Sequence, residues 1–108
     1  MIIREWHARA LPAAPDAYPE HFRTVVVPQL RGVTGFLGAT LTRRRTGSGL
    51  AFTVLTRWRS MDAIRAFAGS AMEQAVVEPG AIAALAEYDD TVCHHEVIAE
   101  VVVPSPGP

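Results

Sequence analysis

The sequence contains no lysine and no asparagine, and each absence removes a class of chemistry. All ten basic residues are arginine, which excludes Schiff-base catalysis on a lysine and a P-loop phosphate site. A mechanism that needs an asparagine amide must use another group here. The single cysteine, Cys93, excludes an intramolecular disulfide and a cysteine-rich metal site.

The chain also has little net charge and no long apolar run, which argues against nucleic acid and membranes as partners. The formal net charge of −1 argues against a nucleic-acid binder held by a basic surface. No run approaches the roughly 20 apolar residues that span a bilayer. The first ten residues, MIIREWHARA, carry charges and lack the apolar stretch of a signal peptide. We therefore expect no membrane association and a cytoplasmic location.

The composition that remains is that of one small folded domain. The chain has 108 residues, of which 49% are hydrophobic and 19% charged, so it can build a core. We expect a single domain over residues 1–103. The last five residues, PSPGP, form a tail at 104–108 that has no means of packing and is expected to be disordered.

Four segments rich in branched and aromatic residues predict β-strands. The Gly-rich stretch RTGSG predicts a hairpin between the second and third of them. The predicted strands cover residues 2–8, 35–44, 50–59 and 91–103.

Helical spacing of apolar residues predicts two main helices. The first has about 15 residues after an N-cap at Asp16, and Pro28 should kink or end it. The second covers 60–69, with Ser60 as its cap and Gly69 as its end. Residues 71–88 are expected to form two short helical pieces broken at Pro79–Gly80.

The predicted order is βαββαβ, which indicates an α+β fold with a ferredoxin-like antiparallel four-stranded sheet. The first and third strands lie at its centre, and the last strand pairs with the first. Helices cover one face of such a sheet. Because apolar residues also lie on the other face, we expect a homodimer in which two sheets pack face to face.

The four histidines are the candidate acids and bases, because imidazole titrates near neutral pH. His94 and His95 are neighbours on a predicted strand, so their side chains point to opposite faces of the sheet. His21 lies one helical turn after Tyr18, at the margin of the face that meets the sheet. The structural alternatives are an interface histidine for the pair and a solvent-exposed one for His21. His7 could approach a histidine of the last strand.

The remaining candidates are an arginine and a set of aromatic residues. Arg4 is the candidate donor to an oxyanion. Metal ligands of suitable type are present in His94, Glu96 and His7, but their spacing is not diagnostic, and we predict no metal site. A pocket for a flat substrate would be lined by aromatic residues, although plain core packing is the alternative. The predicted substrate-binding residues are Trp6, Trp58, Tyr18, Phe52 and Phe67.

Several motifs together resemble one known family. They are Arg4 and Trp6 on the first strand, AYPEH on the first helix, the run from Trp58 to Gly69, the run from Ala75 to Pro79 and His94-His95-Glu96-Val97. This pattern, over about residues 1–98, resembles the small bacterial proteins of the antibiotic biosynthesis monooxygenase superfamily. The resemblance implies a dimeric α+β barrel.

The resemblance also implies activities, which fit this sequence unequally. Characterised members resemble cofactor-free oxygenases of polycyclic aromatic phenols, in which an Asn precedes a strand-three Trp by four residues. Trp58 matches that Trp, but Val54 stands at the Asn position. The haem-degrading branch has a strand-one Asn and a helix-two His, and residues 61–68 contain no histidine. Haem degradation is therefore not expected.

The sequence thus predicts a small enzyme that acts on an aromatic or polyketide-like molecule without a cofactor. A histidine (His94 first, then His95 or His21) abstracts a proton, Arg4 stabilises the oxyanion and the aromatic side chains hold the ring. Monooxygenation is the predicted outcome. The alternatives are a cyclase or isomerase on the same scaffold, or a non-catalytic binding or stress-response protein.

Overall fold

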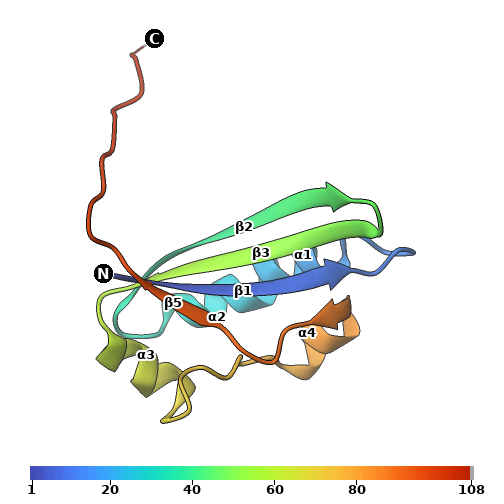
Figure 1. The fold of residues 1–108 in the computed structure, drawn as a ribbon, viewed down its shortest axis with the longest axis horizontal. Coiled ribbons are helices and arrows are strands. Elements are labelled where there is room, and N and C mark those ends of the chain that lie inside the picture. The colour runs from blue at the N-terminus through green and yellow to red at the C-terminus, as the bar shows by residue number, and fades with distance from the viewer. Residues whose placement is uncertain (108) are drawn as a thin grey trace.

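The computed structural model describes residues 1–107, which form an antiparallel sheet with helices packed on one face (Figure 1). The strands are β1 (Ile2–Ala10), β2 (Phe36–Thr46), β3 (Gly49–Trp58), β4 (Leu85–Tyr88) and β5 (Cys93–Glu96). The helical elements are α1 (Ala17–His21), η1 (Phe22–Val26), α2 (Val27–Arg31), α3 (Met61–Ala68) and α4 (Pro79–Ala83).

The sheet has the order β2-β3-β1-β4, and β5 also pairs with β1. All pairings are antiparallel, so β1 and β3 lie at the centre as predicted. Glu5 on β1 lies between Leu55 of β3 and Cys93 of β5. The α+β, ferredoxin-like fold class is confirmed.

The last strand differs from its predicted boundaries of 91–103. Two short strands, β4 and β5, pair with opposite ends of β1, and an irregular stretch of chain separates them. Residues 97–103 are rich in valine and isoleucine but form no strand. A high β-propensity produces a strand only where a neighbouring strand supplies backbone partners. The backbone N–H of Val97 still donates to the Met1 carbonyl, but no described strand lies beside the residues that follow.

The first helix runs through α1, η1 and α2, over the 15 residues 17–31. Pro28 does not end it. A wide turn precedes the proline, in which the backbone N–H of Val27 donates to the carbonyl of Phe22, five residues back. Such a turn gives the proline ring room where a regular α-helix would bring it against the carbonyl four residues back.

The second helix, α3, follows the prediction closely. The Ser60 hydroxyl accepts a hydrogen bond from the backbone N–H of Ala63, and Gly69 ends the helix with φ of 86°. The prediction for 71–88 is wrong in part, because the only helix in that stretch is α4. Residues 71–78 form an irregular segment instead, and Arg4 donates hydrogen bonds to two of its backbone carbonyls.

Alternation along the strands separates a helix-covered face from an open face of the sheet. On the covered face of β3, Phe52, Val54, Thr56 and Trp58 are all buried. The open face, which no helix covers, presents Glu5, His7, Leu55 and other partly exposed or exposed residues of β1, β3 and β5.

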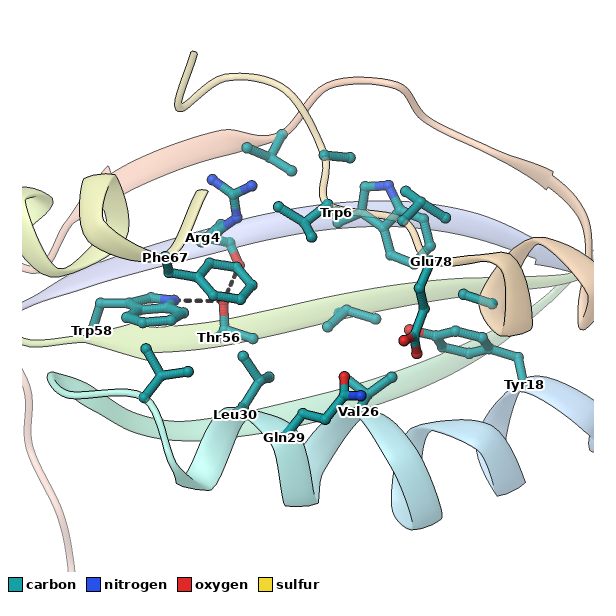
Figure 2. A pocket seen from close by; sticks show the side chains of 17 residues that line it. Arg4, Trp6, Tyr18, Val26, Gln29, Leu30, Thr56, Trp58, Phe67 and Glu78 are labelled. Atoms are coloured by element: carbon teal, nitrogen blue, oxygen red, sulfur yellow. Dashed lines mark hydrogen bonds between the residues drawn. The ribbon is translucent and has the colours of Figure 1, made fainter. Parts of the chain in front are cut away.

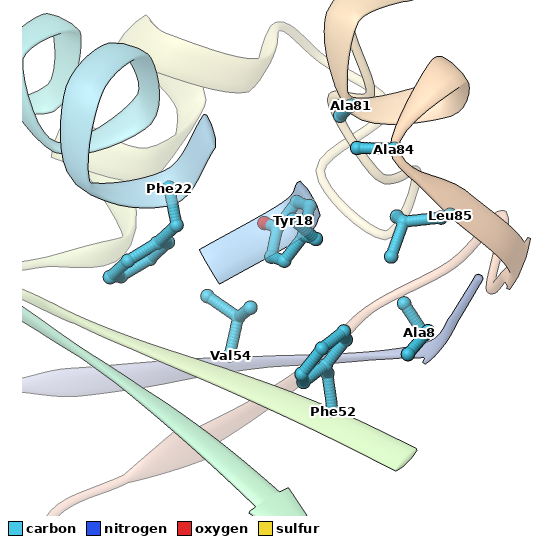
Figure 3. Close-up of a cluster of buried hydrophobic side chains, with 9 residues drawn as sticks. Ala8, Tyr18, Phe22, Phe52, Val54, Ala81, Ala84 and Leu85 are labelled. Carbon is cyan, nitrogen blue, oxygen red and sulfur yellow. The ribbon is translucent and has the colours of Figure 1, made fainter. Parts of the chain in front are cut away.

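The core consists of two apolar clusters on the covered face. The larger one brings Tyr18 and Phe22 of the first helix onto Phe52 and Val54, with Leu85 beside them (Figure 3). The smaller one contains Leu30, Trp58 and Ile64, of which Trp58 and Ile64 have no exposed surface. Burial of each such large side chain contributes about 1.5–3 kcal/mol to folding.

The carboxyl-terminal segment runs away from the sheet as an extended chain (Figure 1). Ile98, Val101, Val102 and Val103 are at least 78% exposed. Residues 104–107 of the predicted tail are also exposed, and Pro108 lies outside the described residues. No described helix is long and apolar enough to cross a bilayer.

Candidate functional site

The two core clusters leave a cavity of about 200 Å³ between the first helix and the covered face of the sheet (Figure 2). Its floor is formed by β1 and β3, one wall by η1 and α2, and the opposite wall by α3 and the segment 75–78. The side chains that can hold or react with a ligand are Arg4, Trp6, Tyr18, Trp58, Phe67 and Glu78.

Both indole rings border the cavity, and both indole N–H groups already have partners. Trp58 donates to the Thr56 hydroxyl at 2.9 Å, and Trp6 donates to the Asp89 carbonyl at 2.7 Å. Phe67 packs against Trp58 with ring centroids 5.1 Å apart. The rings therefore offer apolar faces that suit a flat, hydrophobic ligand.

Arg4 brings a buried positive charge to the cavity wall. Its Nη1 donates to the Met72 carbonyl at 2.7 Å, and its Nη2 donates to the Gln74 carbonyl at 2.9 Å. Nη1 also lies 3.0 Å from Nε2 of His94. These partners occupy three of the five N–H donors of a guanidinium. Burial lowers the pKa of Arg4, although the group stays charged.

His94 contacts Arg4 but does not itself line the cavity. A guanidinium has no acceptor, so Nε2 of His94 must accept the hydrogen bond and Nδ1 must carry the proton. Burial and the positive charge of Arg4 lower the pKa of His94. The imidazole is thus neutral at neutral pH, and its basic nitrogen is occupied.

His21, Glu78 and Tyr18 form a second polar group at the other end of the cavity. Nε2 of His21 lies 2.6 Å from Oε1 of Glu78. The His21 side chain is 13% exposed. Tyr18 is buried, and burial together with the negative charge of Glu78 raises its pKa. Figure 2 shows the Tyr18 ring beside the Glu78 carboxylate.

His95 and His7 lie on the open face, on the opposite side of the sheet from the cavity. Nε2 of His95 is 3.0 Å from Oε1 of Glu5, and Nε2 of His7 is 2.8 Å from Oε2 of the same carboxylate. Glu5 thus joins the two imidazoles. His94 and His7 point to opposite faces, so they do not share a ligand.

The cavity brings together most of the predicted substrate-binding residues but none of the predicted histidines. Arg4, Trp6, Tyr18, Trp58 and Phe67 border it. Phe52 does not, because it is packed in the larger core cluster at 1% exposure.

The three predicted catalytic histidines have different positions relative to the cavity wall. His94 and His21 do not line the cavity, but each is hydrogen-bonded to a residue that does, Arg4 and Glu78 respectively. His95 lies on the open face of the sheet, where it contacts Glu5. The sequence interpretation missed Glu78 and Gln29 as lining residues. The signal for Glu78 was its place directly before Pro79–Gly80, where it is the N-cap residue of α4.

A family model described as "antibiotic biosynthesis monooxygenase" matches residues 1–79, which is most of the chain. The chain belongs to the antibiotic biosynthesis monooxygenase family. The match ends at Pro79, the first residue of α4, so everything after that residue lies outside the matched region. No curated protein sequence matches the chain at a significant level.

Solved structures with the fold of this family span nearly the whole chain. The haem degrader MhuD of Mycobacterium tuberculosis, with two haems bound in its active site, matches with a TM-score of 0.67 and 19% identity, over 94% of this chain and 100% of that one. A Streptomyces coelicolor monooxygenase in complex with nanaomycin D matches with a TM-score of 0.57 and 20% identity, over 96% and 92%. At these identities the similarity shows the shared fold.

The cavity of this family member is a poor match for haem. Haem iron takes an axial His, Cys, Met or Tyr. None of the described residues that line the cavity is His, Cys or Met. The raised pKa of Tyr18 disfavours the phenolate that would bind iron. At about 200 Å³ the cavity is also smaller than the roughly 300–1,000 Å³ of typical ligand sites, so it suits a smaller molecule.

Proposed function

We propose that this protein is a cofactor-independent oxygenase of a small aromatic molecule with an acidic C–H or phenolic O–H group. The observation that carries the proposal is the cavity itself. It is bordered by two indoles and a phenyl ring, with a guanidinium at one end and a carboxylate at the other. The family membership supports oxygen as the second substrate.

The proposed reaction balances without an external reductant. Removal of a proton from an activated CH₂ group leaves a carbanion that is delocalised over the aromatic ring. Dioxygen adds to that carbon and, after taking up a proton, forms a hydroperoxide. Loss of the second hydrogen of the carbon as a proton, with cleavage of the O–O bond, yields a carbonyl group and one water. The carbon loses four electrons and dioxygen gains four.

The residues have distinct roles in this proposal. Trp6, Trp58 and Phe67 hold the ring between apolar faces. Arg4 retains unused N–H donors and a positive charge, which stabilise the negative charge that develops on the substrate. Histidine assistance comes from His21, which acts on the cavity through its hydrogen bond to Glu78, whereas Nε2 of His94 is engaged with Arg4.

The direct test is oxygen uptake by the purified protein with a panel of anthrones and naphthols. We expect uptake of one dioxygen per anthrone converted to its quinone, with catalytic turnover. Addition of a metal chelator should leave the rate unchanged. Failure of every member of the panel to bind or react would contradict the proposal.

A binding function is the second candidate, and one observation favours it. Three donors of Arg4 and both indole N–H groups are engaged within the protein, which leaves a mainly apolar cavity that can hold a ligand without reacting with it. A binder would bind the same probes without consuming oxygen. A cyclase or isomerase would convert its substrate equally well under nitrogen.

We also propose that the protein is a homodimer formed through the open face. Leu55 and Ile3 lie on that face without a helix to cover them, and Glu5 is already paired with two imidazoles. The exposed apolar residues of the segment 97–103 begin at the end of β5, at an edge of the same sheet. A second copy would cover both surfaces, which is the simplest way to bury them.

A further inference from the structure

Glu78 is the carboxylate of the cavity, and one of its two oxygens is available. Oε1 is held by His21. No described residue makes a hydrogen bond to Oε2, and every fully buried side-chain oxygen has a partner, so Oε2 must be accessible. Glu78 is the N-cap residue of α4, but its side chain makes no bond to the helix backbone. The partly exposed Glu78 side chain is bound to His21 and lines the cavity.

His21 is held in place by close packing against α4. A Cβ atom at Gly80 would lie 2.7 Å from Cε1 and 3.3 Å from Nδ1 of His21, so only glycine allows this approach. With the imidazole confined in this way, its hydrogen bond fixes the orientation of the Glu78 carboxylate.

Tyr18 completes the group as a neutral phenol. Burial and the charge of Glu78 both disfavour its ionised form. It therefore does not compete with Glu78 for a proton at neutral pH. It presents its ring and a protonated hydroxyl at the end of the cavity where Glu78 lies.

We infer that Glu78 is the catalytic base of this site and that His21 is its positioning residue. This inference rests on the oxygenase proposed above. The C–H bond of the substrate breaks, its electron pair stays on carbon, and an O–H bond forms at Oε2 of Glu78. That proton returns to the peroxide oxygen after dioxygen has added. Glu78 then takes the second proton of the carbon as the O–O bond breaks and hydroxide leaves, and it passes this proton to the hydroxide, which gives water and restores the carboxylate.

The inference also restricts the substrate. The acidic hydrogen must lie at one end of a flat molecule, because Glu78 lies at the Tyr18 end of the cavity and Arg4 at the Phe67 end (Figure 2). The group that becomes negative, a carbonyl oxygen, should reach toward Arg4. Anthrone-like carbon acids meet this requirement, because their acidic carbon and their carbonyl lie on opposite sides of the central ring. A simple naphthol carries both the acidic hydrogen and the negative charge on one oxygen, so it probes the Glu78 end alone.

The test compares naphthol with its methyl ether, which cannot donate a hydrogen bond to a carboxylate. Binding of both to wild-type protein and to Glu78→Gln is measured by quenching of tryptophan fluorescence. We expect the preference of wild type for naphthol over the ether to fall about tenfold or more in Glu78→Gln, since a hydrogen bond to a charged group is lost. Ether binding should be unchanged. Glu87→Gln, at an exposed position of β4, is the matched control.

Turnover and positioning are tested with further variants. Oxygen uptake with anthrone should fall about 100-fold or more in Glu78→Gln. Glu78→Asp, which keeps the charge but shortens its reach, replaces it if Glu78→Gln does not fold. His21→Leu should reduce the naphthol preference, and His21→Gln, which restores an N–H donor, should recover most of it.

The outcomes separate the two proposals. An unchanged naphthol preference in a folded Glu78→Gln protein overturns the base assignment and leaves the cavity as the ligand site. Equal loss in His21→Leu and His21→Gln overturns the positioning role. If wild type binds neither probe, the proposed function fails, and the base assignment fails with it.

Discussion

Nη1 of Arg4 lies 3.0 Å from Nε2 of His94, across 90 residues of sequence. The two residues face each other in the register of β1 with β5. Protonation of His94 would break this contact, because a protonated imidazole has no free nitrogen that can accept the hydrogen bond from Arg4. The protonation state of His94 is therefore coupled to the position of the buried guanidinium.

The first prediction concerns pH and stability. The pKa of His94 is lowered from 6.5 in the folded state, so below that pH the unfolded chain binds a proton that the folded chain resists. The free energy of unfolding should therefore fall as the pH drops from 6.5 toward the folded pKa. Urea unfolding across this range measures it. His94→Gln should show a shallower fall, and an equal slope in both proteins would refute the linkage.

The second prediction concerns the geometry of Arg4. Lysine keeps the charge but cannot reach Met72, Gln74 and His94 together, so Arg4→Lys should leave carbonyls of the segment 71–78 without partners. We expect a loss of about 2–4 kcal/mol in the free energy of unfolding. Arg65→Lys, on the exposed side of α3, should change it by less than about 0.5 kcal/mol. Similar values for the two variants would show that the contacts of Arg4 are unimportant for stability.

The third prediction concerns the packing of Gly80 on His21. Gly80→Ala places a methyl group 2.7 Å from Cε1 of the imidazole, so the ring must move and its bond to Glu78 should weaken. The His21 resonances in an NMR spectrum and the naphthol preference should both change. Gly47→Ala is the control, since no atom lies within 4 Å of its added Cβ. An unperturbed His21 in Gly80→Ala would contradict the packing argument.

The fourth prediction tests the cavity by filling it. Ala81 is buried on α4 and lines the cavity, whereas Ala83 is exposed on the same helix. Ala81→Leu should abolish binding of naphthol and anthrone while the protein stays folded, because added methyl groups occupy the ligand's space. Ala83→Leu should bind normally. Retained affinity in Ala81→Leu would place the ligand elsewhere.

The fifth prediction addresses the open face. Leu55→Arg puts a charge at the centre of the proposed dimer interface, next to Glu5, with which it can pair inside one chain. Sedimentation should show a shift from dimer to monomer with the secondary structure retained. Ala66→Arg, on the exposed side of α3, should remain dimeric. A monomeric wild-type protein would rule the dimer out.

Patterns that repeat over short distances predicted the larger part of the fold. Helical spacing placed the first helix and α3, and the Gly-rich stretch placed the hairpin between β2 and β3. The prediction failed for 71–78, 85–88 and 97–103, whereas the helical piece predicted after the break at Pro79–Gly80 is present as α4. Arg4 binds two backbone carbonyls of the first stretch, the second pairs with β1 as β4, and the third has no strand beside it.

The sequence by itself determined that His94 and His95 lie on opposite faces, because side chains alternate along any strand. It also determined the order of the elements as far as α3 and the aromatic residues of the central strands. Only the tertiary structure decided which face the helices cover. It alone brought Glu78 to His21, 57 residues away. Alternation and helical spacing act over a few residues, whereas contacts between distant segments depend on how the whole chain packs.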